Sequence, residues 1–244
     1  MKLAVEKLEA GYQGKMVVKD VSFTVEKGEF ISLIGPSGCG KSTVLKVLAG
    51  LLEPMAGTIM VDDAPLQGGS RHFSYMPQSD LLLDWYDILD NVCLYGKIHG
   101  KKKEAQQQAL ENLKEFGLAG YEHAYPSQLS GGMRQRAAFL RTALCDSDIL
   151  LLDEPFGALD VITREDMQDW LNRMRQRLDR TTLLVTHDID EAIYLSDRIL
   201  ILGQRPATIT RIVDVRHPHK DRAWLYAQGE LRAAIHQELS HEVL

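Results

Sequence analysis

The sequence predicts an α/β fold in which a core sheet carries an antiparallel β-subdomain at its N-terminus and an inserted α-helical subdomain. Three observations support this prediction. Apolar segments of strand length alternate with segments of helical periodicity, the chain opens with alternating apolar and polar residues, and the span 79–147 is mostly helical in character. We expect a single domain over residues 1–244, with its core in 1–78 and 148–220 and a C-terminal helix in 221–244.

The composition is that of an ordinary globular protein, with 45% hydrophobic and 25% charged residues. A net charge of −6 and a pI near 5.8 argue against a nucleic-acid partner. The three cysteines lack metal-ligand spacing, which indicates a reducing, cytosolic environment. No apolar run approaches the ~20 residues that cross a bilayer, so we expect any membrane contact to be made through a partner.

The first strands are predicted to be antiparallel. Residues Leu3 to Leu8 alternate as an edge strand would, and Val21 to Val25 repeat the pattern before a turn at Lys27-Gly28. The next strand, Glu29 to Ile34, is apolar and runs into a glycine-rich loop, which a helix from Ser42 to Ala49 follows.

This loop fits the phosphate-binding pattern G-x-x-x-x-G-K-[ST]. Its glycines let consecutive backbone N–H groups approach phosphate oxygens, Lys41 places a charge on the β- and γ-phosphates, and the hydroxyl of Ser42 suits Mg²⁺. We therefore expect a P-loop NTPase (RecA-like) core that binds a nucleotide and Mg²⁺. The residues expected to bind the phosphates are Gly35, Pro36, Ser37, Gly38, Cys39, Gly40, Lys41, Ser42 and Thr43.

Two isolated polar or aromatic residues are candidates for the same site. Tyr12 lies in a turn-rich run where no local periodicity needs an aromatic ring, so we interpret it as stacking on adenine; packing on the rim of a sheet is the alternative. Gln78 follows a predicted strand, Phe73 to Pro77, and its amide can meet a metal, a water or a phosphate; a solvent-facing side chain is the alternative. A predicted strand over Gly57 to Val61 and a predicted turn over Gly68 to Arg71 precede the strand Phe73 to Pro77.

The inserted segment is predicted to contain a helix that begins near Val92 and another from Glu104 to Phe116. Ser130 is the expected N-cap of a third helix, which ends near Leu144. Ser130-Gly131-Gly132 at this helix start would form a second anion-binding nest.

The predicted strand Asp148 to Pro155 delivers two adjacent carboxylates at its C-terminal end, where ligands bind in α/β sheets. We expect Asp153 to bind Mg²⁺ and Glu154 to orient and polarise an attacking water; two solvated turn acids are the alternative. His187 ends the strand Thr181 to Thr186 and can donate to a γ-phosphate, although a histidine taken singly is more often structural. The remaining expected elements are helices at Arg164–Leu178, Ile189–Ser196 and beyond about Asp221, and strands at Arg198–Leu202 and Thr208–Val215.

Taken in order, these motifs resemble the nucleotide-binding ATPase subunits of ABC transporters over essentially the whole chain. The matching segments are Gly35 to Ser42, Gln78, Leu129 to Gly132, Leu151 to Glu154, Ala158 to Asp160, and His187. One departure is Met133, which replaces the glutamine usual after Leu-Ser-Gly-Gly; its side chain is not expected to supply phosphate donors.

The resemblance implies an ATPase that acts as a head-to-tail homodimer, in which Ser130 and Gly132 of one copy close over the γ-phosphate bound at Lys41 of the other. Catalytic roles are implied for Gln78, Glu154 and His187, with Gln78 also among the Mg²⁺ ligands. The implied partners are integral membrane permease subunits, docked after Gln78, and indirectly a periplasmic or lipid-anchored solute-binding protein. The implied location is peripheral, at the cytoplasmic face of the inner membrane.

Met133, the Met76-Pro77-Gln78 segment and the short C-terminus look most like the subfamily that imports nitrate, sulfonates, taurine and thiamine-precursor pyrimidines. The sequence does not name the solute. A DNA-repair or chromosome-maintenance ATPase of the same superfamily is the alternative, but it would carry a long coiled-coil insertion. A P-loop kinase would need an acceptor site and a lid instead of the Ser130 nest.

Overall fold

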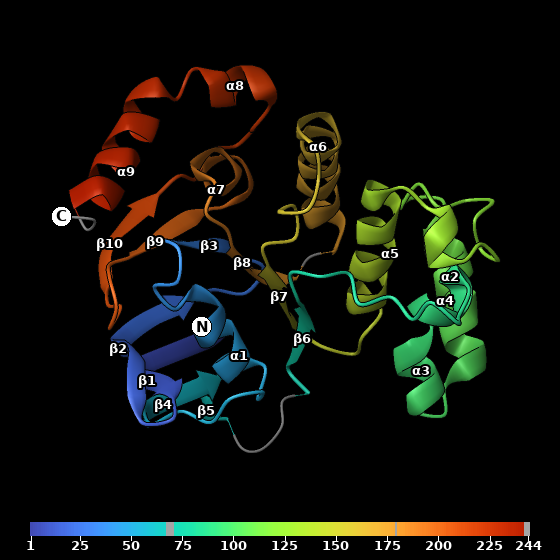
Figure 1. Cartoon of the computed structure of the whole chain (residues 1–244), viewed down its shortest axis with the longest axis horizontal. Coiled ribbons are helices and arrows are strands. Elements are labelled where there is room, and N and C mark those ends of the chain that lie inside the picture. Colours follow the sequence, from blue (N-terminus) through green and yellow to red (C-terminus); the bar gives the residue numbers. More distant parts are fainter. Residues whose placement is uncertain (67–70, 179, 242–244) are drawn as a thin grey trace.

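The computed structural model describes residues 1–66, 71–178 and 180–241, and it confirms the mixed α/β fold (Figure 1). A six-stranded sheet has the strand order β10-β9-β3-β8-β7-β6, and a four-stranded sheet has the order β2-β1-β4-β5. The predicted turn over Gly68 to Arg71 lies mostly outside the described residues. The strands of the larger sheet are β3 (Phe30–Ile34), β6 (Phe73–Met76), β7 (Ile149–Asp153), β8 (Thr181–Val185), β9 (Arg198–Leu202) and β10 (Ile209–Asp214).

The larger sheet is parallel except for β10, which runs antiparallel to β9 at one edge. Every residue of β3, β7 and β8 is buried, because both faces of the sheet are covered. Ile31 and Leu33 pack in one core cluster, while their neighbours Phe30 and Ile34 pack in the other. The carboxyl ends of parallel strands meet at one edge, so the segments after β3, β6, β7 and β8 lie close together.

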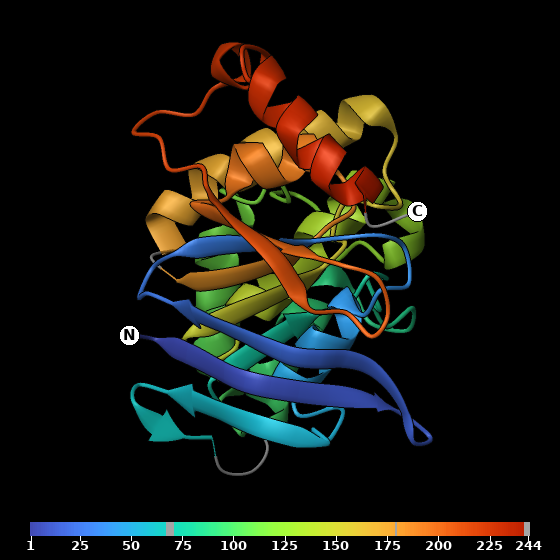
Figure 2. The same ribbon diagram turned by 90° about the vertical axis from the view of Figure 1, so that its left-hand side faces the viewer.

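The smaller sheet consists of β1 (Leu3–Tyr12), β2 (Lys15–Val25), β4 (Ala56–Val61) and β5 (Ala64–Pro65), all antiparallel. The prediction that residues Leu3 to Leu8 form an edge strand was wrong, because β1 pairs with β2 on one side and with β4 on the other. The partner β4 comes from beyond the phosphate loop, and local alternation does not report such a pairing. Figure 2 shows this sheet and α9 at opposite ends of the molecule.

Nine α-helices lie in the described residues: α1 (Lys41–Leu48), α2 (Ile88–Val92), α3 (Leu94–Ile98), α4 (Lys102–Leu113), α5 (Gly131–Ala143), α6 (Val161–Leu178), α7 (Ile189–Leu195), α8 (Arg222–Tyr226) and α9 (Gly229–His241). The helix predicted near Val92 is two short helices that meet at Cys93. The predicted C-terminal helix is likewise two, α8 and α9. None of these helices within the described ranges is long and apolar enough to span a membrane.

Helix α1 packs against β1, β2, β7 and β8, whereas α7 packs against β3 and α6. Helices α2 to α5 lie beside one another on one side of the molecule (Figure 1), and α5 connects them to the core through β6. The rings of Phe116, Phe139 and Trp170 pack edge to face, which joins α5 to α6. The helical segment therefore rests on the β6 edge of the larger sheet.

Candidate functional site

The glycine-rich loop connects the end of β3 at Ile34 to the start of α1 at Lys41. Gly40 has φ +130°, and a Cβ there would lie 2.7 Å from Val18 Cγ1 and 2.9 Å from Val17 Cγ1. Gly38 also has a positive φ, of 74°. Only glycine fits Gly40 without strain or a clash, so the loop packs closely on β2 at this position.

Lys41 points its ammonium back into this loop, where Nζ donates to Gly35 O at 2.9 Å and Pro36 O at 3.0 Å. Its side chain is buried, and the carbonyls that surround it replace the solvent that a buried ammonium would lose. A cavity opens beside it, lined by Ser37, Gly38, Gly40, Lys41, Ser42, Thr43, Glu154, His187 and Arg205.

Two hydroxyl groups hold the carboxylate of Asp153, which is buried at the end of β7. Ser42 donates to its Oδ1 at 2.8 Å, and Tyr75 donates to its Oδ2 at 2.9 Å. Burial and the neighbouring carboxylate raise the pKa of Tyr75 above its usual value. Ser42 and Asp153 supply adjacent hard oxygen atoms, so the residues present fit Mg²⁺.

Sequence reasoning missed Tyr75. The feature that brings Tyr75 to the site is the parallel register of β6 on β7, which pairs Tyr75 with Leu151, two residues before Asp153. This register becomes visible only once the two strands are known to be neighbours.

The predicted catalytic residues meet at the carboxyl ends of β6, β7 and β8. Glu154 Oε2 accepts a hydrogen bond from Gln78 Nε2 at 3.0 Å and lies 3.5 Å from His187 Nδ1, a contact that is an ion pair when the imidazole is protonated. Glu154 adopts φ +46°, a conformation that is uncommon for a residue with a side chain. Its backbone N–H donates to Val185 O at 2.9 Å, which fixes this turn against β8.

Comparison with known proteins decides the family. Residues 18–157 match the family described as ABC transporter. This chain belongs to the ABC transporter family. The ABC transporter chain is 41% identical to the taurine import ATP-binding protein TauB of Yersinia pestis, over 96% of its own length and 90% of TauB.

Two further relatives carry import names. The chain is 49% identical to the aliphatic sulfonates import ATP-binding protein SsuB 1 of Rhodococcus jostii, over 85% of this chain and 80% of that protein. It is 47% identical to the formylaminopyrimidine import ATP-binding protein ThiZ of Halalkalibacterium halodurans, over 84% of this chain and 80% of ThiZ. A dimeric post-hydrolysis structure of the ATP-binding cassette MJ0796, bound to ADP and Pi, has a TM-score of 0.73 at 28% identity, over 88% of this chain and 99% of that one.

Two predicted nucleotide-binding segments of this ABC transporter chain do not line the Lys41 cavity. Tyr12 is the last residue of β1, is exposed, and lies opposite Lys15 across the hairpin. Ser130 is the N-cap of α5, as predicted, and its Oγ accepts from Met133 N at 3.3 Å. A Cβ on Gly132 would lie 2.6 Å from Thr163 Cγ2, so the Ser130 nest lies against the start of α6.

The backbone around His187 is fixed by polar contacts that sequence reasoning did not find. Thr186 Oγ1 donates to Glu191 Oε2 at 2.5 Å and accepts from Asp188 N at 3.0 Å. Glu191 Oε1 accepts from Gln168 Nε2 at 3.0 Å. Burial raises the pKa of Glu191 to about 7. These contacts join the segment that carries His187 to both α6 and α7.

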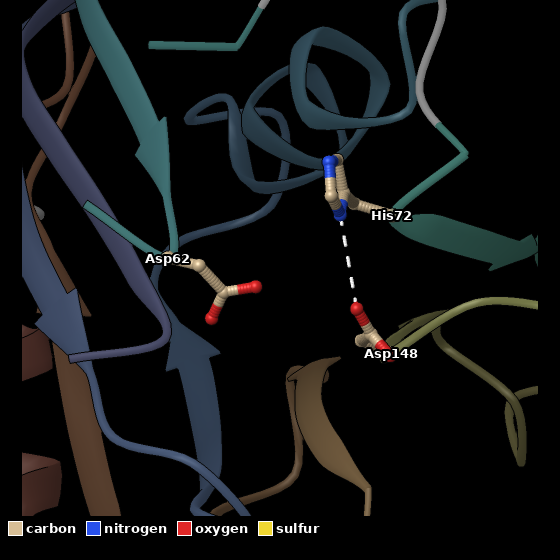
Figure 3. Close-up of side chains that lie close together, drawn as sticks. All are labelled: Asp62, His72 and Asp148. Atoms are coloured by element: carbon tan, nitrogen blue, oxygen red, sulfur yellow. Dashed lines mark ion pairs between the residues drawn. The ribbon is translucent and has the colours of Figure 1, made fainter. Parts of the chain in front are cut away.

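A second cluster of possible metal ligands joins the two sheets (Figure 3). Ligand atoms of Asp62, His72 and Asp148 lie within 4.8 Å of one another. The ammonium of Lys2 donates to Asp62 at 2.7 Å and to Asp148 at 2.9 Å. Because a buried ammonium already supplies positive charge to both carboxylates, we interpret the cluster as a structural link between the two sheets, at the residues that precede β1 and β7 and follow β4.

Proposed function

We propose that this chain is the ATP-hydrolysing subunit of an ABC importer. The observation that carries the proposal is that Lys41, Glu154 and His187 line one cavity, although they lie on three separate segments of the chain. ATP hydrolysis is the activity of the family to which the chain belongs. The taurine, sulfonate and formylaminopyrimidine import names of its relatives support import as the use of that activity.

In this proposal the backbone N–H groups of residues 37–43 and the Lys41 ammonium bind the polyphosphate. Ser42 and Asp153 would bind Mg²⁺, with Gln78 as a further oxygen ligand, and the ion would neutralise charge on the β- and γ-phosphate oxygens. Tyr12 would stack on the adenine ring.

Glu154 orients a water and accepts its proton as the water oxygen attacks the γ-phosphorus. The bond from the γ-phosphorus to the bridging oxygen breaks, and ADP leaves. His187 donates a hydrogen bond to the γ-phosphate. The contact between Gln78 and Glu154 supports a role for this glutamine in orienting the same carboxylate.

The site is proposed to be completed by a second copy of the chain. Residues 130–132 do not line the cavity that contains Lys41, yet they form a helix N-terminus suited to an anion. A head-to-tail homodimer would place Ser130, Gly131 and Gly132 of one copy over the γ-phosphate of the other. The dimeric form of the similar cassette MJ0796 supports this arrangement.

The proposed partners are integral membrane permease subunits and, indirectly, a solute-binding protein, with the chain peripheral to the inner membrane on its cytoplasmic face. The solute is proposed to be a small compound such as taurine, another sulfonate, nitrate or a thiamine-precursor pyrimidine. A chromosome-maintenance role is disfavoured. The longest described helix between the phosphate loop and the Ser130 nest is α4, which has 12 residues and cannot form a long coiled coil.

The test is the Glu154→Gln variant. We expect it to bind MgATP, to turn over at least about a hundredfold more slowly, and to elute as a stable dimer in MgATP. Glu165→Gln, which removes an exposed acid of α6, is the matched control and should hydrolyse at the normal rate. Normal turnover by Glu154→Gln would show that Glu154 is not the base, and a monomer in MgATP would contradict the shared site.

Import is tested separately with the purified permease complex in liposomes. Stimulation of ATP hydrolysis by taurine, an alkanesulfonate, nitrate or a formylaminopyrimidine, with its cognate binding protein, would identify the solute. Co-purification of nucleic acid in place of a membrane protein would favour the chromosome-maintenance alternative.

A further inference from the structure

The hairpin between β9 and β10 carries a cation to the phosphate loop. Arg205 lines the cavity that contains Lys41, and it also lines an adjoining hollow formed by Pro36, Ser37, Gly38 and Cys39. The Arg205 side chain is exposed, and its guanidinium forms no hydrogen bond or ion pair within the part of the chain that the structure describes. A cation without an acidic partner, beside an anion cradle, is available for a ligand.

The backbone on both sides of Arg205 is held in place, on one side by the phosphate loop and on the other by β2. A Cβ on Gly35 would lie 2.7 Å from Leu202 O, so the end of β9 touches the first residue of the loop. Ala207 N donates to Val17 O at 2.9 Å, and Lys19 N donates to Ala207 O at 2.9 Å. The side chain of Val17 is one of those that close on Gly40, so the strand segment that anchors the hairpin also contacts the other end of the loop.

The chemistry of this position favours a phosphate. A guanidinium stays charged and presents several N–H donors in a plane, which matches the oxygens of a phosphate group. The Lys41 ammonium is the neighbouring cation, and loop carbonyls already accept two of its hydrogen bonds. In both hollows Arg205 borders Ser37 and Gly38, in the first half of the loop, whereas Thr43 at the start of α1 borders only one.

We propose that Arg205 is a nucleotide-binding residue that donates to phosphate oxygens of ATP from the Ser37–Gly38 side of the loop. This inference rests on the proposed function, because it assigns a further contact within the same ATP site. Arg205 would add a charged hydrogen-bond donor to the ATP site. This donor comes from the β9–β10 hairpin, which contains none of the sequence motifs described above.

The experiment measures binding of MgATP, MgADP and pyrophosphate to the full chain by calorimetry, for the wild type, Arg205→Gln, Arg205→Lys and Arg211→Gln. We expect Arg205→Gln to raise the Kd of all these ligands about tenfold, and Arg205→Lys to recover part of the loss. Affinity of the wild type should fall more steeply with added salt than affinity of Arg205→Gln, since the variant lacks one charge. Arg211→Gln, which removes an exposed arginine of β10 paired with Glu238, should bind as the wild type does.

Equal Kd values for Arg205→Gln and the wild type would overturn the inference and leave the proposed function standing. Equal losses of ligand affinity in Arg205→Gln and Arg211→Gln would also overturn it. The loss would then come from a disturbed hairpin and not from the missing guanidinium of Arg205. Weaker ATP binding with unchanged pyrophosphate binding would place the contact on the base or ribose and likewise contradict the proposal. A wild type that binds no MgATP would contradict the proposed function itself.

Discussion

The hydroxyl of Tyr75 donates a 2.9 Å hydrogen bond to Asp153 Oδ2, on the carboxylate whose other oxygen accepts from Ser42. The two strands that carry Tyr75 and Asp153 are parallel neighbours, so the contact is fixed by the register of β6 on β7. A hydroxyl group that donates to a metal-binding carboxylate can set the orientation of that carboxylate without touching the metal.

We therefore expect Tyr75→Phe to weaken the affinity of the nucleotide complex for the metal about tenfold, while the free energy of unfolding falls by no more than about 1.5 kcal/mol. Titration with Mn²⁺ in the presence of ADP, followed by electron paramagnetic resonance, measures this affinity. Tyr226→Phe changes an exposed tyrosine and is the control. An unchanged metal affinity in Tyr75→Phe would show that the hydrogen bond is structural only.

The raised pKa of Glu191 predicts a pH-dependent stability. Between its ordinary value of 4.5 and about 7, the unfolded chain has released the proton while the folded chain retains it, so raising the pH favours unfolding. The stabilisation from this group is complete below pH 4.5 and is lost by about pH 7, a change of about 3 kcal/mol.

Glu191→Gln lacks the titrating group but can still accept from Thr186 after the Gln168 amide turns. We expect the difference in unfolding free energy, wild type minus variant, to fall from pH 4.5 to 7 and to stay constant above that range. Urea unfolding at fixed pH values measures it. A difference that does not vary with pH would mean that Glu191 ionises normally in the folded chain.

The Lys2 link between the sheets predicts a modest loss of stability in Lys2→Met. The hydrogen bond from Lys2 lowers the pKa of Asp148, and a carboxylate with a lowered pKa contributes stability above its ordinary range that is lost in acid. Both carboxylates are more than half exposed, so we expect a loss of only about 1 kcal/mol near neutral pH.

Urea unfolding of Lys2→Met beside the exposed control Lys19→Met checks this value. We also expect Zn²⁺ to leave the melting temperature of the wild type unchanged, since the Lys2 ammonium already lies against both acids. A rise in melting temperature with Zn²⁺ would instead identify Asp62, His72 and Asp148 as a metal site.

Met133→Gln restores the glutamine usual in the family and is expected to change the ATPase rate by less than about twofold. The hydrogen bond made by Met133 uses its backbone N–H, which donates to Ser130 Oγ and is kept in the variant, while its partly buried side chain packs against the core cluster, where a glutamine of similar length can lie. Steady-state phosphate release measures the rate. A large gain in turnover would show that the side chain at this position contributes to the proposed site between two copies.

The local motifs from which the site is predicted can be recognised in the sequence because their chemistry restricts residue type over short spans. Gly40 can be recognised in the loop because no other residue fits φ +130° beside Val17 and Val18. The cap at Ser130 was predicted because its acceptor and donor lie three residues apart. Buried strands such as β3 and β7 were predicted because continuous apolar runs bounded by glycine or acidic residues are typical of a covered parallel sheet.

The sequence by itself predicted which residues of this protein are suited to bind phosphate, metal and water, and it determined the order in which they occur. Only the tertiary structure decided that β1 lies inside its sheet, that Tyr75 reaches Asp153, that Arg205 faces the loop, and that Gln78 and His187 meet at Glu154. The physical reason is that strand order and register are set by packing between distant segments. The strand order β8-β7-β6 places three chain segments side by side, and no periodicity within any one of them carries that information.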